Sequence, residues 1–191
     1  MRTAAVILAA GASTRLGEPK QLITIHGETL LARAIRIAQE SGVDHVFAVL
    51  GANSAALRAH AHIATIVENP LWQQGMGTSI RTGVQAAAAY DAVLLLTCDQ
   101  PSVTPFHLVQ LLVAGEEGKR IAASAYAERT GVPALFPQKY FAELIALTGD
   151  SGARNLLRMH KQDVVEVPLE NGELDLDTPE SLEAIRRLWS A

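Results

Sequence analysis

The chain has 191 residues, 49% of them hydrophobic, and a formal net charge of −4 at pH 7. This length suits a single domain over residues 1–191, and the acidic balance argues against a nucleic-acid-binding protein. A single cysteine, Cys98, excludes an intrachain disulfide and is typical of a reducing compartment. No apolar run reaches the ~18 residues of a membrane-spanning helix, and the first residues lead into a glycine loop without a signal-peptide cleavage site. We therefore expect a cytoplasmic protein with no membrane contact.

Short apolar runs alternate with segments of helical periodicity along the whole chain. The runs predict strands at Ala4–Leu8, His45–Leu50, Ala64–Val67, Ala92–Thr97, Arg120–Tyr126, Ala134–Phe136 and Val164–Pro168. The periodic segments predict helices at Leu30–Glu40, Ser54–His60, Ser79–Ala89, Pro105–Ala114, Pro137–Leu147, Gly152–Arg158 and Pro179–Trp189. This alternation predicts an α/β protein with a mostly parallel sheet covered on both faces. Ligands of such sheets bind beyond the carboxyl ends of the strands.

A glycine-rich loop with one arginine and one lysine follows the first predicted strand. Gly11 and Gly17 allow close backbone approach to a ligand, and Arg15 and Lys20 supply positive charge, which together favour a polyphosphate site. The spacing does not match a P-loop, because Lys20 lies three residues after Gly17 and is followed by glutamine. A dinucleotide fingerprint is also absent, since serine stands where its second glycine belongs and Pro19 argues against a helix running off the loop.

Carboxylates appear at two further places. Asp99 follows the apolar strand Ala92–Thr97, where it could hold a metal bound to a triphosphate or form an Asx turn before proline. Asp175 and Asp177 lie near the C-terminus, two residues apart and therefore on the same side of an extended chain. Asp177 is the favoured second metal ligand, although an acidic residue before a helix is also explained by the helix dipole.

The segments Asn69–Gly77 and Ala127–Val132 are the main irregular stretches, and both are candidate loops over a site. The first leads through Gly75, Gly77 and Ser79 into a predicted helix, whose N–H groups could bind a base edge or a phosphate. Its tryptophan and methionine could equally pack beneath the loop.

The loop pattern Leu-Ala-Ala-Gly-x-Ser-x-Arg-x-Gly-x-x-Lys resembles the signature of nucleotidyltransferases. With the other motifs, the chain resembles the molybdenum cofactor cytidylyltransferase family, within the wider group of molybdopterin-guanine-dinucleotide-type transferases. The matching stretches are Leu8–Lys20, Asn69–Gly83, Cys98–Pro101, Gly131–Phe136, Gly149–Ala153 and Asp175–Glu180. The resemblance implies a Rossmann-like three-layer α/β/α nucleotidyltransferase fold. It also implies transfer of CMP from CTP to the terminal phosphate of the molybdenum–molybdopterin cofactor, with release of pyrophosphate and a requirement for Mg²⁺, which Mn²⁺ can replace at oxygen sites.

The resemblance also implies roles for individual residues. The catalytic residues would be Arg15, Lys20 and Asp99. The nucleotide would be bound by Leu8, Ala9, Ala10, Gly11, Lys20, Gly75, Gly77 and Ser79. The metal would be bound by Asp99 and Asp177. Alanine rather than glycine at Ala10 points to CTP, although one methyl shifts specificity by only about 1–3 kcal/mol.

On the acceptor side, the resemblance places Gly131–Phe136 and Gly149–Ala153 facing the pterin, whereas the residues themselves favour Asp150 or Ser151 as a helix cap. A transient contact with a molybdenum hydroxylase apoenzyme or its chaperone would follow from this role. Two alternatives stay open. One is a cytidylyltransferase for another phosphorylated acceptor, such as the methylerythritol phosphate type, which shares Pro19-Lys20-Gln21 but carries a different metal segment. The other is a non-catalytic carrier that delivers the finished cofactor.

Overall fold

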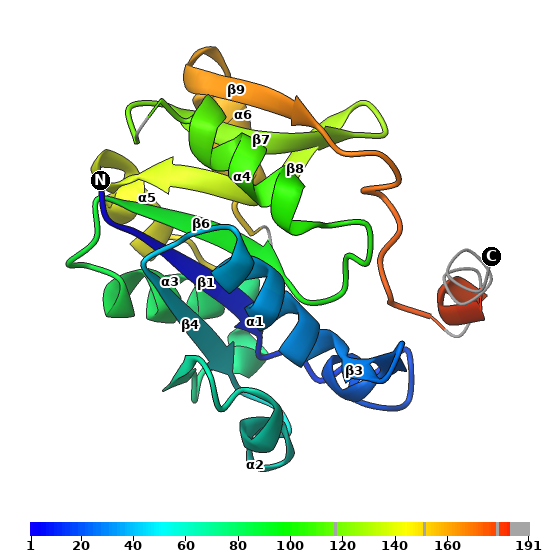
Figure 1. Cartoon of the computed structure of the whole chain (residues 1–191). Coiled ribbons are helices and arrows are strands. Elements are labelled where there is room, and N and C mark those ends of the chain that lie inside the picture. The colour runs from blue at the N-terminus through cyan, green and yellow to red at the C-terminus, as the bar shows by residue number, and fades with distance from the viewer. Residues whose placement is uncertain (117, 151, 179, 184–191) are drawn as a thin grey trace.

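The computed structural model describes residues 1–116, 118–150, 152–178 and 180–183. A mixed sheet of seven strands forms its centre, in the order β5-β4-β1-β6-β8-β7-β9 (Figure 1). The strands are β1 (Thr3–Ala9), β4 (His45–Leu50), β5 (Thr65–Glu68), β6 (Ala92–Thr97), β7 (Ile121–Tyr126), β8 (Arg129–Pro137) and β9 (Val164–Pro168). Strand β8 runs antiparallel to both of its neighbours, and the remaining pairs are parallel. A small second sheet pairs β2 (Thr24–Ile25) with β3 (Glu28–Thr29).

Helices cover both faces of the central sheet and make three layers (Figure 1). The helices are α1 (Leu30–Glu40), α2 (Ser54–Leu57), α3 (Met76–Ala86), α4 (Pro105–Ala114), α5 (Phe141–Ile145) and α6 (Arg154–Met159). Side chains of α1, α2 and α4 pack in one core with alternate residues of β1, such as Ile7. Side chains of α3, α5 and α6 pack in a second core with the intervening residues, such as Val6. The predicted α/β fold with a mostly parallel sheet is confirmed.

The predicted elements differ from the observed ones mainly where packing sets the boundaries. Helix α3 begins three residues before the predicted Ser79, so Gly77 and Ser79 lie in its first turn. The predicted helix Pro137–Leu147 divides into the 3-10 turn Gln138–Tyr140 and the short α5. The segment Ala127–Val132 is no loop, since β8 starts at Arg129 and forms a hairpin with β7. Of the predicted helix Pro179–Trp189, the structure describes only residues 180–183, which are helical.

A third and smaller apolar cluster ties the C-terminal segment to the loop after β1. It contains Ile23, Ile25, Leu30, Leu176 and Leu182, with Leu16 packed against it. After β9 the chain crosses the molecule to reach this cluster, as the orange segment in Figure 1 shows. The backbone N–H of Leu176 also donates to the carbonyl of Asp99, at 3.1 Å. These contacts bring the carboxyl end of the described chain to the loop after β1.

Candidate functional site

The central parallel strands end together at one edge of the sheet. Ala9 of β1 pairs with Leu50 of β4, and Leu8 pairs with Thr97 of β6. The loops that follow these strands therefore meet at that edge, which is where ligands bind in α/β folds. The loop after β1 carries the arginine and lysine, and the loop after β6 carries Asp99.

A buried glutamine holds the loop after β1 in shape. The Gln21 side chain is 1% exposed, and its Nε2 donates to the carbonyl oxygens of Ala9 and Gly11 at 3.0 and 2.8 Å. Ser13, with a φ of 55°, accepts at its Oγ from the backbone N–H of Lys20 at 3.1 Å. These bonds close the loop on itself and fix where the lysine side chain starts.

Four charged side chains form a connected network at this edge. The Nζ of Lys20 lies 2.5 Å from Oδ2 of Asp99 and 2.7 Å from Oδ1 of Asp177. The second carboxylate oxygen of Asp177 accepts from Arg15 at 2.6 Å. Arg15 is exposed, whereas the Lys20 and Asp99 side chains are 19% and 13% exposed. The structure thus brings together Arg15, Lys20, Asp99 and Asp177 from three distant segments.

The pKa values of the network follow from burial and mutual charge. Burial alone would lower the pKa of Lys20, but Asp99 and Asp177 outweigh it and raise that pKa, so the ammonium stays charged. Burial opposes ionisation of Asp177, yet Lys20 and Arg15 bring its pKa below the ordinary value. Asp175 shows the opposite shift, because burial and the nearby charges of Asp177 and Asp99 raise its pKa. The charged lysine therefore lies between two carboxylate side chains and favours the ionised form of Asp177.

The carboxylates suit a metal that is bound together with a polyphosphate. Oxygens of Asp99 and Asp177 lie within hydrogen-bond distance of one nitrogen atom, so a cation is favoured between them. Within residues 1–116, 118–150, 152–178 and 180–183, no group of three or more histidine, cysteine, aspartate or glutamate residues forms a complete metal cage. Mg²⁺ characteristically takes one or two carboxylates and fills its other positions with phosphate oxygens and water. The donor set fits that pattern.

A hollow of about 320 Å³ lies beside the network, within the range of small-ligand pockets. It is lined by Leu8, Ala10, Gly11, Ala12, Ser13, Thr14, Trp72, Gln73, Gly75, Met76, Ser79 and Asp150. A smaller hollow continues toward the charges and is lined by Gly11, Ser13, Thr14, Arg15, Leu16, Lys20, Leu176 and Asp177. Gly11, Ser13 and Thr14 line both, so the two hollows adjoin.

Two of the predicted nucleotide-binding residues lie behind the surface of this hollow. Ala9 is 1% exposed and gives its carbonyl to Gln21. A Cβ atom on Gly77 would lie 2.9 Å from the backbone of Leu147 and Thr148, so this glycine permits close packing of the chain after α5. Gly75, at a φ of 103°, faces the backbone of Gly149 in the same way while still lining the hollow.

Ser79 lines the hollow and is held by a buried asparagine. The Nδ2 of Asn69 donates to the hydroxyls of Thr78 and Ser79 at 2.9 and 3.0 Å, and its Oδ1 accepts from the N–H of Leu71. Asn69 follows β5 and is 2% exposed. It therefore fixes the start of α3 against the preceding loop.

Several residues of the site escaped the sequence analysis. Gln21 and Asn69 were noticed only as parts of motifs, although a buried amide has to bond to something. Gly51 follows β4, and a Cβ there would meet the Trp72 side chain at 2.6 Å and Ala10 at 2.9 Å. A glycine directly after a predicted parallel strand was the available signal.

Asp150 caps no helix, because α6 begins after Ala153 without a side-chain cap from the described residues. Asp150 lines the hollow instead.

The fold and the lysine–carboxylate edge define an α/β nucleotidyltransferase, and comparison with known proteins specifies the family. The model of the MobA-like NTP transferase domain matches residues 5–164. The chain belongs to the MobA-like NTP transferase family.

Proteins of several names are similar to this chain. Nicotine blue oxidoreductase from Paenarthrobacter nicotinovorans is 34% identical, over 93% of each chain. Purine catabolism protein PucB from Bacillus subtilis is 30% identical, over 97% of this chain and 96% of PucB. A probable molybdenum cofactor guanylyltransferase from Opitutus terrae is 27% identical, over 87% and 85%.

The fold is also that of solved structures. Rv0371c from Mycobacterium tuberculosis H37Rv superposes with a TM-score of 0.84 at 28% identity, covering 98% of each chain. The same protein in complex with manganese gives a TM-score of 0.79 at 26% identity, covering 98% of this chain and 99% of that one.

Among the described residues, no helix is long and apolar enough to cross a membrane.

Proposed function

We propose that the protein transfers CMP from CTP to the terminal phosphate of the molybdenum–molybdopterin cofactor and releases pyrophosphate. The observation that carries the proposal is the network of Lys20 and Arg15 with Asp99 and Asp177 beside a hollow of nucleotide size. Cations for a triphosphate and carboxylates for its metal stand at one edge of the sheet. The name of the Opitutus terrae relative supports a molybdenum cofactor as acceptor.

In this reaction the acceptor phosphate attacks the α-phosphorus in line with the departing pyrophosphate. No covalent intermediate with the protein is needed, so catalysis consists of positioning and charge stabilisation. Lys20 and Arg15 hold the triphosphate and balance the charge that grows on the leaving pyrophosphate. Before substrate binds, both cations are engaged by the carboxylates, so the triphosphate replaces one set of anionic partners by another.

Asp99 and Asp177 are the side chains that would hold Mg²⁺ or Mn²⁺. A bound divalent ion supplies charge neutralisation between phosphate oxygens. The manganese complex of Rv0371c, a protein of the same fold, supports a divalent metal in the proposal. Asp175 lies near both carboxylates, and its pKa is raised. Protonation of Asp175 would lower the total negative charge of the three side chains.

The choice of CTP rests on Ala10. This residue is 4% exposed and lines the hollow. Its Cβ would lie 2.9 Å from a Cβ built on Gly51, a position that the Trp72 side chain also approaches. The methyl narrows the space for a base, which disfavours a purine by the equivalent of about 1–3 kcal/mol.

The test is pyrophosphate release from CTP, GTP, ATP and UTP in parallel, with Mg²⁺ and molybdenum-loaded molybdopterin. We expect acceptor-dependent release with CTP, and a smaller CTP/GTP preference in Ala10→Gly by roughly 5- to 100-fold. Ala12→Gly is the matched control, because it adds the same backbone freedom to the same hollow without changing the wall at Trp72. A preference for GTP in the wild-type protein would keep the mechanism and refute the role of Ala10.

Two other activities are distinguished by the same assay. A cofactor carrier would bind molybdopterin without consuming CTP. The Paenarthrobacter nicotinovorans relative is named an oxidoreductase. Hydride transfer from a bound dinucleotide is disfavoured here, because the loop after β1 carries Ser13 where the Gly-x-Gly-x-x-Gly fingerprint has its second glycine. Pyrophosphate release that depends on both CTP and acceptor would exclude both.

A further inference from the structure

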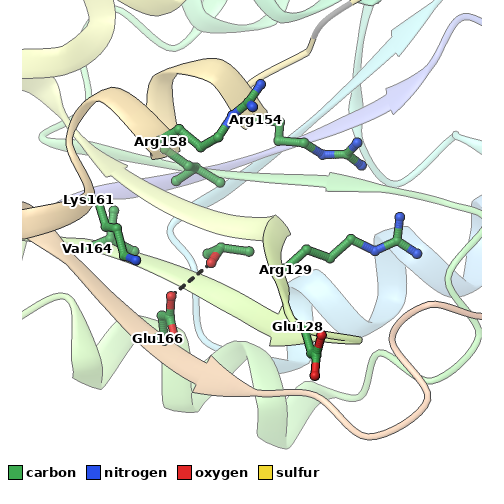
Figure 2. Close-up of a pocket in the computed structure, with 9 residues that line it drawn as sticks. Glu128, Arg129, Arg154, Arg158, Lys161, Val164 and Glu166 are labelled. Carbon is green, nitrogen blue, oxygen red and sulfur yellow. Dashed lines mark hydrogen bonds between the residues drawn. The ribbon is translucent and has the colours of Figure 1, made fainter.

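A basic pocket lies next to the proposed active site, and the proposed reaction gives it no role. Its volume is about 370 Å³, and it is lined by Glu128, Arg129, Thr130, Arg154, Leu157, Arg158, Lys161, Val164 and Glu166. The pocket lies between the hairpin of β7 and β8, the helix α6 and the strand β9. Figure 2 shows the side chains of Arg129 and Arg154 extending in the same direction from β8 and from α6.

Positive charge exceeds negative charge in this pocket, although the chain as a whole carries −4. Four cationic side chains face two carboxylates. Glu166 accepts from the hydroxyl of Thr130 at 2.9 Å. Within the described part of the chain, none of Arg129, Arg154, Arg158 and Lys161 has a carboxylate within 4.0 Å.

Two of these arginines also face the catalytic edge. Arg129 and Arg154 line a second hollow, of about 130 Å³, whose wall includes Asp99, Gln100 and Asp175. Gln100 is fixed there by bonds from its Nε2 to the carbonyls of Val132 and Gly172, at 3.1 and 3.2 Å. The basic pocket therefore opens next to the carboxylate that is proposed to hold the metal.

Arg154 and Arg158 also come near the nucleotide hollow without lining it. They line a third hollow, of about 330 Å³, with Leu8, Met76 and Asp150. The same three residues line the hollow assigned to the nucleotide. Arg154 thus lines the basic pocket, the Asp99 hollow and the third hollow, which shares three residues with the nucleotide hollow.

We propose that Arg129, Arg154 and Arg158 bind the acceptor through a second anionic group, distinct from its attacking phosphate. The inference rests on the proposed function, because an acceptor whose phosphate is placed near Asp99 extends its remaining atoms into the adjoining pocket. Guanidinium groups bind oxyanions through paired hydrogen bonds. The acceptor class is accordingly a phosphate monoester that carries a second oxyanionic group at a distance. An oxo-metal dithiolene centre would be such a second group.

Separate kinetic constants for acceptor and nucleotide test the proposal. We expect Arg129→Gln, Arg154→Gln and Arg158→Gln each to raise the acceptor KM by roughly 10- to 100-fold, since a charged hydrogen bond is lost. The Kd for Mg·CTP should stay within about twofold, because none of the three side chains lines the nucleotide hollow. Arg154→Lys should restore part of the affinity.

Lys119→Gln is the matched control for charge. It removes one exposed cation before β7, whereas Arg129 follows the far end of that strand. An equal rise of the acceptor KM in this control would refute the proposal, as would an unchanged acceptor KM in the three arginine variants. An equal loss of CTP affinity would assign the arginines to the nucleotide and also refute it.

A direct titration separates this inference from the proposed function. Inorganic phosphate is added to the wild-type protein saturated with Mg·CTP, and the arginine Nε–H signals are followed by NMR. We expect saturable shifts for the three arginines and loss of saturation in Arg154→Gln. If no nucleotide supports transfer to molybdopterin but these shifts saturate, the proposed function fails and the anion site stands. If the shifts do not saturate, the anion site is refuted whatever the transfer assay gives.

Discussion

Lys20 occupies the position that a metal and a triphosphate would share. Its ammonium contacts Asp99 and Asp177 at once, and these carboxylates in turn raise its pKa against the effect of burial. Substrate binding therefore rearranges charges that are already in place. In the proposed reaction, the nucleotide would draw Lys20 toward phosphate, and the carboxylates would become available for a divalent ion.

This arrangement leads to opposite effects of one substitution on two measurements. Lys20→Ala should lower kcat by roughly 10²-fold or more, since it removes a preorganised charge from the leaving group. Without nucleotide, the same variant should bind Mg²⁺ more tightly, because the ammonium no longer competes for Asp99 and Asp177. Steady-state kinetics and isothermal titration with MgCl₂ measure the two effects. Near-normal turnover in Lys20→Ala would refute its role, and Lys119→Gln controls for net charge.

Among single residues, the charged side chains of the site could be predicted from the sequence, whereas the residues that position them could not. Asp99 and Lys20 carry ionisable groups in the segments that follow β6 and β1, and charged residues in such loops can be recognised from the sequence. Gln21 and Gly51 act through a buried bond and an absent side chain. Their roles depend on which atoms lie opposite, and that information resides in the tertiary structure.

Helix α3 lies against the sheet at a distance that one glycine sets. A Cβ atom at Gly83 would lie 2.3 Å from Cγ1 of Val6 and 3.0 Å from Cγ2 of Val49. Glycine is ordinarily unfavourable inside a helix, where alanine is better by about 0.5–1 kcal/mol. Close approach to β1 and β4 outweighs that propensity here.

Gly83→Ala should therefore destabilise the protein, against the helix-propensity expectation. We expect the free energy of unfolding in urea to fall by about 1–3 kcal/mol through overpacking. Val6→Ala removes the opposing methyl group, so the double variant should be less destabilised than the sum of the two single changes. Additive losses would show that Gly83 and Val6 are not in conflict.

Element prediction succeeded where local pattern and packing agree. Strands β4 and β6 and helix α4 have the predicted bounds, and Thr104 caps α4 by accepting from the N–H of His107. The start of β8 was missed because Arg129–Val132 combines charge, glycine and a following proline, none of which favours a strand. Pairing with β7 overrides those preferences.

Across the whole molecule, a buried histidine connects one helix layer with the antiparallel part of the sheet. His107 of α4 is 4% exposed, and its Nε2 lies 2.8 Å from the hydroxyl of Ser124 on β7. That hydroxyl donates its own proton to the carbonyl of Pro133 on β8, at 2.7 Å. The imidazole must then donate through Nε2 as the neutral tautomer. One hydrogen-bonded chain thus connects α4, β7 and β8.

This histidine makes global stability depend on pH. Burial lowers the pKa of His107 below its ordinary value of 6.5. As the pH falls below about 6.5, the unfolded chain takes up a proton at this site before the folded chain does. The unfolding free energy should therefore decrease between pH 7 and pH 5, by up to about 1.4 kcal/mol per pH unit. Below the folded-state pKa this contribution levels off.

His107→Gln should weaken the dependence of the unfolding free energy on pH, because an amide can donate to Ser124 but does not titrate. Urea unfolding at half-unit pH steps gives the slope, which matters more than the absolute stability of the variant. His62→Gln is the control, since His62 is exposed and its Nδ1 lies 3.0 Å from the nearby carbonyl of Ala59. A full wild-type slope in His107→Gln would place the acid sensitivity elsewhere, whereas a slope lost in both variants would show that it is not specific to the buried joint.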